Sequence, residues 1–415
     1  MRKNRRRAFN PAVDRLDAIV LPSNVPFAFL GENLAQNALI TSQGVYDTTT
    51  ATFYVVPSSA SSYAIATPDG IVGHDNVPFM FRALNNSDQP LYDLSGNPLF
   101  DYVVYDKTTA TFIVDMPNSP GYYAVADGTP GDSNTPFVTY AGVSSNGTPL
   151  FNFAVYDNTT GYFIVHQNAA PGYFLEQLGT AGANNTPFIL WSGNQEPGFQ
   201  LQAGAPVLYA VYDHTTAQWS GLYWEENGSG WFLGGPFVMN QGVAGDVNTP
   251  FVTPWVNAQG YTQYGTGPAA SIQFDVSVYD HTTATFHVGG FYGNAYTVQV
   301  GTLGDNNVPN INFNGFTTVP TYLLEVYDTN TAVFTDVNTQ NNNYTTTAAD
   351  GIIGDTNIPF LESYLLGETG NSLEYGYAHI VYDVNISTFI VVPGENTVLY
   401  PGGTYYAVQI GNPND

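Results

Sequence analysis

The chain has 415 residues, of which 34 are acidic and only eight are Lys or Arg, and its net charge at pH 7 is −26. No Lys or Arg follows Lys107, so the body of the protein has too few cations to bind nucleic acid or a phosphorylated substrate, and an anionic membrane would repel it. The absence of cysteine excludes disulfides, thiol catalysis and cysteine-based zinc sites.

Residues 1–21 form a separate basic segment, because five of the eight cations lie within the first seven residues. The stretch RRRAFNPAVDRLDAIVLPS resembles the Arg-Arg-rich N-terminal motif of exported planctomycete proteins, although Asp14 and Asp17 stand where that motif more often has Glu. The residues that carry the likeness are Arg6, Arg7, Phe9, Pro11, Val13, Leu16, Leu21 and Pro22. The apolar run AIVL is too short for a secretory signal core, and nothing approaches the ~20 apolar residues of a membrane span. An export segment and a disordered basic tail are the two interpretations.

Two short motifs alternate along the rest of the chain. The first, Val-Tyr-Asp, has its Asp at Asp47, Asp106, Asp157, Asp213, Asp280, Asp328 and Asp383. The second, Asn-x-Pro, begins at Asn24, Asn76, Asn134, Asn185, Asn248, Asn307 and Asn357. Seven units with both motifs in one order indicate a repeat architecture.

One unit, residues 134–179, contains four short apolar or alternating runs: PFVTYAG, LFNFAVY, YFIVH and GYFLEQLG. Each run predicts a strand, and hairpin-length joins predict an antiparallel order. No segment has a long helical period. We therefore predict an all-β fold, a seven-bladed β-propeller of four-stranded antiparallel blades over residues 22–411. A linear string of small β-modules is the alternative, and a closed ring requires residues 24–30 to lie near 405–411.

The Val-Tyr-Asp motif predicts a hairpin. Its Asp is expected at the start of the turn, where the carboxylate accepts hydrogen bonds from N–H groups two residues on. A large aromatic residue follows each Asp after six positions, and with the motif tyrosines these residues are expected to fill the space between blades. Seven catalytic or metal-binding Asp residues are the alternative.

The combination GxxGDxNxPF…VYDxTTATFxV resembles the VCBS/FG-GAP repeats of integrin-α-like seven-bladed propellers, over about residues 22–411. Many repeats of that family carry a calcium loop rich in Asp and Gly. The matching stretches here lack clustered carboxylates, and the nearest case, with Asp88, Asp93 and Asn97, is expected to be a solvated loop. We therefore expect no cofactor and no structural metal in most blades.

Recognisable catalytic motifs are absent from the sequence. The six histidines show no metal-binding spacing, and no phosphate loop, nucleophile elbow or zinc-protease motif occurs. Two carboxylates from different blades could still meet, as glycoside hydrolysis requires. We expect that the protein is not an enzyme, and convergent carboxylates in the central channel would argue otherwise.

One insertion breaks the repeat. The distance from the motif Asp to the next Asn-x-Pro is 27–29 residues in five units and 35 in the fourth, which contains WEENGSGW. Aromatic and acidic side chains there suit a neutral glycan or a protein partner. The predicted binding residues are Tyr223, Trp224, Glu225, Glu226, Trp231 and Trp255. The alternative is that these tryptophans pack beneath their own loops.

The function expected from these features is that of a non-enzymatic, exported structural or adhesive protein at the cell surface. Its expected partners are a protein or a neutral glycan met by a propeller face, self-association included, with no nucleic acid and no membrane insertion. A lectin or a carbohydrate-active enzyme on a propeller scaffold is the alternative.

Overall fold

The computed structural model describes residues 24–33, 38–56, 65–85, 90–94, 96–115, 122–145, 147–167, 172–191, 206–226, 231–255, 273–289, 295–304, 306–316, 320–339, 344–369, 372–393 and 406–410. Within these ranges the named elements are 28 β-strands in seven four-stranded antiparallel sheets. The same ranges contain no helix with the length and apolar character to cross a membrane. The predicted tail, residues 1–21, lies outside them.

Each sheet is one continuous segment of chain whose strands pair in sequence order. The first four blades are β1 (Asn24–Asn33), β2 (Ala38–Asp47), β3 (Thr52–Val56), β4 (Ile65–Pro68); β5 (Asn76–Arg82), β6 (Phe100–Asp106), β7 (Thr111–Asp115), β8 (Tyr122–Ala126); β9 (Asn134–Val143), β10 (Pro149–Asp157), β11 (Tyr162–Gln167), β12 (Gly172–Gln177); and β13 (Asn185–Trp191), β14 (Pro206–Asp213), β15 (Gln218–Glu226), β16 (Trp231–Asn240). The last three are β17 (Asn248–Pro254), β18 (Phe274–Asp280), β19 (Thr285–Val288), β20 (Tyr296–Gln299); β21 (Asn307–Phe316), β22 (Pro320–Asp328), β23 (Val333–Asn338), β24 (Tyr344–Ala349); and β25 (Asn357–Thr369), β26 (Ser372–Asp383), β27 (Thr388–Pro393), β28 (Tyr406–Gln409).

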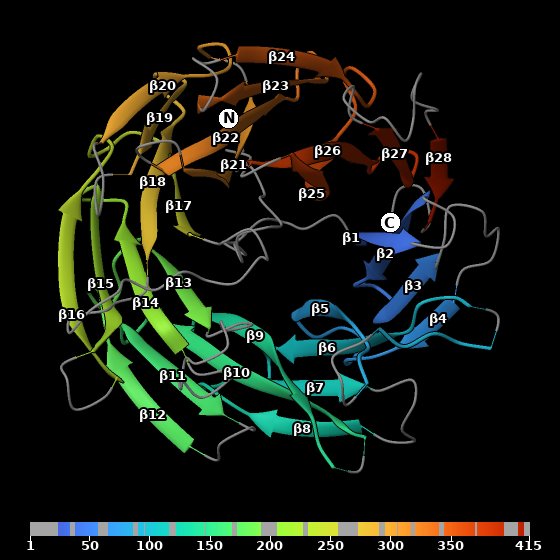
Figure 1. Ribbon diagram of the computed structural model, residues 1–415. Helices are drawn as coiled ribbons and strands as arrows, with labels where there is room; N and C mark the ends of the chain where they lie inside the picture. The colour runs from blue at the N-terminus through green and yellow to red at the C-terminus, as the bar shows by residue number, and fades with distance from the viewer. Residues whose placement is uncertain are drawn as a thin grey trace, which may run out of the picture.

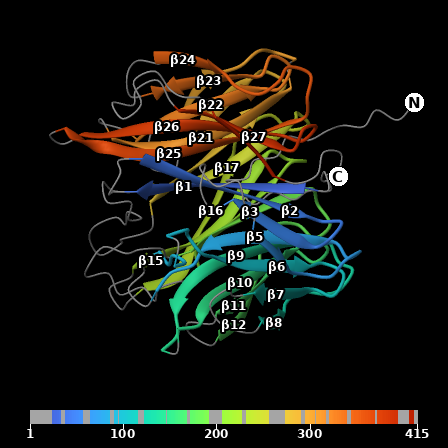
Figure 2. The ribbon, with the colours of Figure 1, turned by 90° about the vertical axis from the view of Figure 1, so that its right-hand side faces the viewer.

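The seven sheets close into a ring, which confirms the predicted propeller. Figure 1 looks along the ring axis, with the first strand of each blade nearest the centre and the fourth at the rim. The ring closes where β1 contacts β25, and Ala28 of blade one shares a buried cluster with Ile410 at the end of blade seven. Figure 2 shows the ring from the side, where the long β25–β26 hairpin reaches past its neighbours on one face. The alternative of a linear string is wrong.

The two repeated motifs build one face of the ring. In each blade the Asn that begins the first strand pairs with the Asp that ends the second, as Asn76 does with Asp106. The loops between blades and the hairpins between second and third strands therefore share this face. The connections between first and second strands, and between third and fourth, lie on the opposite face. The hairpin β15–β16 ends on that opposite face.

The motif Asp organises the hairpin as predicted. In blade two, Asp106 accepts a hydrogen bond from the Thr108 N–H (2.8 Å) through Oδ1 and another from the Thr109 hydroxyl (2.8 Å) through Oδ2. The chain then turns through Ala110, whose φ is 51°. A left-handed residue at this point completes the reversal, and in blade three Gly161 takes the position with φ 74°. The turn explains the motif Asp without any ligand.

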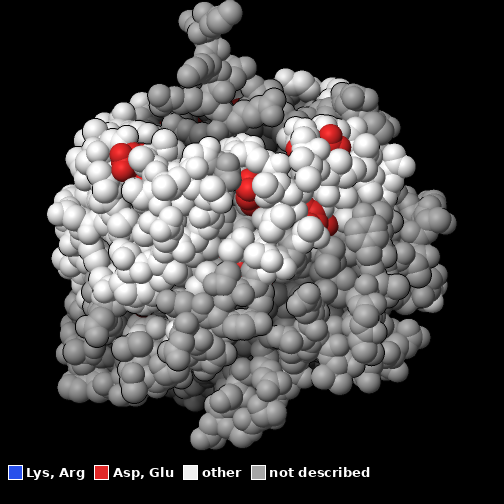
Figure 3. All heavy atoms as spheres, turned by 90° about the horizontal axis from the view of Figure 1, so that it is seen from above, with Lys and Arg blue, Asp and Glu red and all other residues white. Residues whose placement is uncertain are grey.

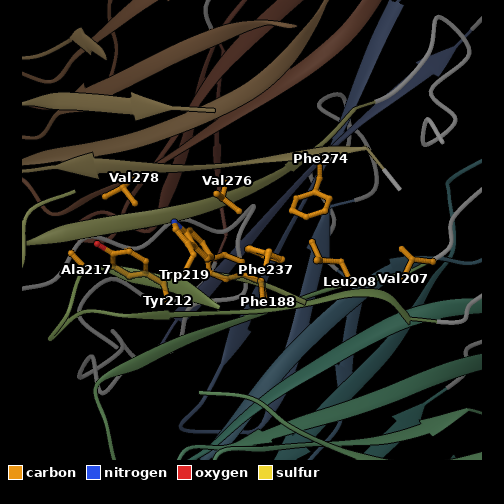
Figure 4. Packing of buried hydrophobic residues seen from close by; sticks show 11 residues of the cluster. Phe188, Val207, Leu208, Tyr212, Ala217, Trp219, Phe237, Phe274, Val276 and Val278 are labelled. Atoms are coloured by element: carbon orange, nitrogen blue, oxygen red, sulfur yellow. The ribbon is translucent and has the colours of Figure 1, made fainter. Parts of the chain in front are cut away.

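The core lies between blades. The ring of Phe112 is 4.5 Å from Tyr105 of its own blade and 4.7 Å from Phe153 of the next. Between blades four and five, Trp219 takes the place of this phenylalanine and belongs to one buried cluster with Val276 and Phe274 (Figure 4). The motif tyrosines and the aromatic residues six positions after each motif Asp therefore fill the spaces between blades, as predicted.

Candidate functional site

The insertion in blade four forms an extended outer hairpin. Strands β15 and β16 have nine and ten residues, whereas the third and fourth strands of the other blades have four to six. Pairing continues beyond the bulge at Gly221 and Tyr223 to Glu226 opposite Trp231. The hairpin thus extends past the level at which the other outer strands end.

The base of this hairpin is aromatic. Tyr223 and Trp224 are half-buried and pack against the core between blades four and five. The Tyr223 ring lies 5.9 Å from Phe274 and covers the backbone of Gly235, where an added Cβ would come within 2.6–2.8 Å of ring atoms. The side chains of Glu225, Glu226 and Trp231 lie outside the described part of the structure.

Trp255 lies in a different part of the ring. It is 5% exposed, and its indole N–H donates to Asp275 Oδ2 at 2.9 Å and faces the Tyr322 oxygen of blade six at 3.3 Å. Its ring stacks on Phe313, also of blade six, with centroids 6.4 Å apart. Trp255 is therefore engaged in the interface of blades five and six, and the structure does not bring it together with Trp224 of blade four.

Several carboxyl groups are buried between blades at a repeated position. Asp69, Asp127 and Asp350 each follow the fourth strand of a blade and precede a left-handed glycine. Burial raises their pKa to about 8, 8 and 7 respectively. Buried carboxyl groups with raised pKa values are typical of functional sites and of structural networks, so geometry has to separate the two.

Two acids and a histidine converge between blades six and seven. His379 Nε2 on β26 lies 3.2 Å from Glu325 Oε2 on β22 and 3.2 Å from Asp336 Oδ2 on β23. Glu325 and His379 are 2% and 4% exposed. Burial raises the pKa of Glu325; burial alone would lower the pKa of His379, but the two carboxylates raise it. The His379 ring also stacks on Phe334 at 4.4 Å.

Sequence reasoning missed this cluster because its members come from unequal positions in two blades. A comparison of the seven units within the chain holds the signal. Eight residues after the motif Asp, five units have Val and one has Gly, but the sixth unit has Asp336. Glu325 likewise stands where the other units have Gly, Val, Ala, Ser or Ile. Charged residues at repeat positions that are small or apolar in the other units therefore mark this interface as different from the rest.

The inner strands show no comparable gathering of acids. Among the side chains described on the seven first strands, Arg82 is the one that carries a charge. Figure 3 shows the molecule from above, at right angles to the view of Figure 1. On this side the acidic groups are scattered, and no Lys or Arg is visible among the described residues. The convergent carboxyl groups therefore lie between blades rather than along the described inner strands.

Comparison with known proteins gives weak likenesses. No protein-family model matches the chain, and no curated protein matches its sequence. A virginiamycin B lyase from Staphylococcus aureus aligns with 8% identity and a TM-score of 0.41, over 81% of this chain and 89% of that one. A functionally unknown protein from Desulfotomaculum acetoxidans aligns with 10% identity and a TM-score of 0.38, over 88% and 91%. Neither likeness carries a conclusion about activity, and the fold rests on the strand pairing above.

Proposed function

We propose that this propeller is a non-enzymatic, exported surface protein of structural or adhesive type, which binds a protein or a neutral glycan through the face that holds the β15–β16 hairpin. The observation that carries the proposal is the outgrowth of this one hairpin, with Tyr223 and Trp224 at its base. The likeness to VCBS/FG-GAP repeats and the basic N-terminal segment support the extracellular assignment.

The distribution of charge supports a binding role over a catalytic one. Hydrolysis of a glycosidic bond requires two carboxyl groups that both face the substrate. Asp69 and Asp127, whose pKa values are raised, are instead enclosed between blades and are 6% and 3% exposed. A substrate in the central channel would not reach them.

The excess of negative charge also restricts which kinds of partner can bind. With a net charge of −26 and no Lys or Arg after Lys107, the hairpin has no cation of its own repeat to attract an anion. Like charges across an interface oppose binding, so a neutral glycan or a cationic protein patch is favoured. Half-exposed aromatic side chains supply the flat apolar surface on which a sugar ring stacks.

A glycan array of neutral oligosaccharides, probed with the full chain, tests the proposal. We expect binding that falls at least about tenfold in Trp224→Ala, since aromatic anchors dominate the energy of such contacts. Because Trp224 packs on the core between blades four and five, circular dichroism must show that the variant still folds. Tyr92→Ala is the matched control, because Tyr92 is an exposed aromatic residue of blade two (50%) and its loss should leave binding unchanged.

The array also separates the alternative function. Release of shortened products from a bound glycan would show a carbohydrate-active enzyme and contradict the proposal. Specific glycan binding without turnover would narrow the proposal to a lectin. Absence of glycan binding, with salt-sensitive binding to a basic protein surface, would leave protein adhesion as the function.

A further inference from the structure

We propose that Glu325, Asp336 and His379 bind a divalent transition-metal ion of the zinc class between blades six and seven. The site does not depend on the function proposed above, which places its contacts on blade four. No repeat-wide feature accounts for these residues, since the positions of Glu325 and Asp336 are filled by small or apolar residues in the other blades.

The three donor atoms are spaced as metal ligands are. One oxygen from each acid and one nitrogen from His379 lie within 4.8 Å of one another, and the nitrogen is 3.2 Å from each oxygen. Ligands bound tetrahedrally at about 2.0–2.1 Å are about 3.3–3.4 Å apart. The two nitrogen–oxygen distances are therefore close to those that a bound ion requires.

A protonated imidazole satisfies the same group less well. Nε2 has a single N–H, so it cannot point at both carboxylate oxygens, each of which lies 3.2 Å away. The second ring nitrogen, Nδ1, also has no hydrogen-bond partner among the described residues. A central cation satisfies the three converging atoms at once, because coordination does not require one N–H to point in two directions.

Asp350 is a further buried carboxyl group of the same blade. Asp350 is 3% exposed, and the Gly351 backbone N–H favours its charged form. The strand register places Asp350 on the same face of blade six as Phe334 and Asp336, toward blade seven. Burial raises the pKa of Asp350, whereas the charge of the His379 imidazole acts to lower it. Among the described residues the closely spaced donors are Glu325, Asp336 and His379, so Asp350 contributes negative charge to this interface rather than a ligand atom.

The ligand types select the metal. Imidazole with carboxylates suits zinc, manganese or iron, whereas calcium and magnesium prefer oxygen ligands alone. An ion of charge +2 would also offset the negative charge of Glu325 and Asp336, which is costly to enclose without a cation. This is a different site from the acidic loops of calcium-binding repeats, where we expected no metal.

Metal retention by the refolded full chain tests the proposal. The protein is unfolded in urea with EDTA, refolded with one equivalent of Zn²⁺ or Ca²⁺, passed over a chelating resin and analysed by elemental mass spectrometry. We expect one zinc and no calcium per chain, and a higher Tm for the zinc-loaded form, because binding to the folded state alone stabilises it. Asp336→Asn and His379→Gln should retain no zinc.

Two controls address general effects of charge and folding. His74→Gln removes a histidine that pairs with Asp106 at 2.8 Å in blade two, and Asp69→Asn changes the residue of blade one that corresponds to Asp350. Both should retain one zinc. If His379→Gln does not fold, Glu325→Gln replaces it, and this variant should likewise retain no zinc. A wild-type chain without zinc, equal retention of calcium, or equal loss in the His74 variant would overturn the proposal.

Discussion

The hydroxyl of Tyr279 donates a 2.9 Å hydrogen bond to the backbone carbonyl oxygen of Val300, which lies 21 residues later at the end of the same blade. The contact joins the end of the second strand to the segment that leaves the fourth. It recurs in every blade, between Tyr46 and Asp69, Tyr105 and Asp127, Tyr156 and Leu178, Tyr212 and Gln241, Tyr327 and Asp350, and Tyr382 and Ile410. The motif tyrosine therefore fixes where one blade ends and the next begins.

Replacement of one such hydroxyl should have a measurable cost. In Tyr279→Phe the ring still fills its site, but the buried Val300 carbonyl loses its partner. We expect the free energy of unfolding to fall by about 1–2 kcal/mol, as for a buried polar group left unsatisfied. Urea denaturation of Tyr279→Phe against wild type measures the change. Tyr92→Phe, at a residue 50% exposed, should change stability by less than about 0.5 kcal/mol.

Two glycines in the loop between blades one and two allow the cost of backbone strain to be measured apart from the cost of a steric clash. Gly70 and Gly73 both have positive φ, 91° and 83°. A Cβ at Gly70 would lie 2.8 Å from the Tyr46 hydroxyl, whereas a Cβ at Gly73 would have nothing within 4 Å. Gly73→Ala should cost only the backbone strain, about 1–2 kcal/mol. Gly70→Ala adds displacement of the tyrosine and should cost clearly more in the same thermal or urea unfolding assay. Equal costs would contradict this role of Gly70.

The motif Asp should matter for stability rather than for binding. In blade five, Asp280 accepts a hydrogen bond from the Thr282 N–H at 2.8 Å and from the Thr283 hydroxyl at 2.7 Å. Asp280→Ala removes both and should lower the free energy of unfolding by about 1–3 kcal/mol, since hydrogen bonds to a charged group are the stronger kind. Asp246→Ala, in the loop that precedes the same blade, is the control. A loss of ligand binding without loss of stability would show that Asp280 has another role.

The ring could be predicted from the sequence because each of the seven repeats specifies its own strands and turns. Each unit carries its own turn chemistry, in Asp106 for example, and its own aromatic residue, Phe112, so that periodicity alone defined strands and blades. Closure also followed from the count of whole units. For the fold, the structure adds the register of the strand pairs. It also adds the hydrogen-bond partner of each motif tyrosine hydroxyl, which the sequence pattern did not assign.

The candidate sites were harder to predict because they depend on which blade faces which. Trp224 and Trp255 lie 31 residues apart in sequence and both depart from the repeat, yet Trp255 faces blade six. His379 meets Glu325 only because the sixth blade packs on the seventh. Such contacts between blades leave no fixed spacing in the sequence. In the sequence, the contact of blades six and seven is marked only by charged residues at repeat positions that are small or apolar in the other units.

Asp127 should make stability fall as the pH rises. Burial raises its pKa from 3.8 to about 8, although the Gly128 N–H favours the charged form. Between about pH 4 and pH 8 the folded state therefore holds a proton that the unfolded state releases, so the free energy of unfolding decreases with pH over this window. The stabilisation that comes from this bound proton is complete below the pKa of Asp127 in the unfolded chain. It is lost as the pH rises through the pKa of Asp127 in the folded protein.

Asp127→Asn removes this titration and keeps the shape of the side chain. We expect the variant to match wild type within about 0.5 kcal/mol at pH 4.5 and to be more stable by about 1–3 kcal/mol at pH 8.5, where the wild type must bury a charge. Urea unfolding at the two pH values measures the difference. Asp132→Asn, at a half-exposed carboxylate in the same loop, should show no such pH-dependent gain. Equal stability of Asp127→Asn and wild type at pH 8.5 would mean that the Asp127 carboxylate is stabilised by a partner, and that it is ionised in the folded protein.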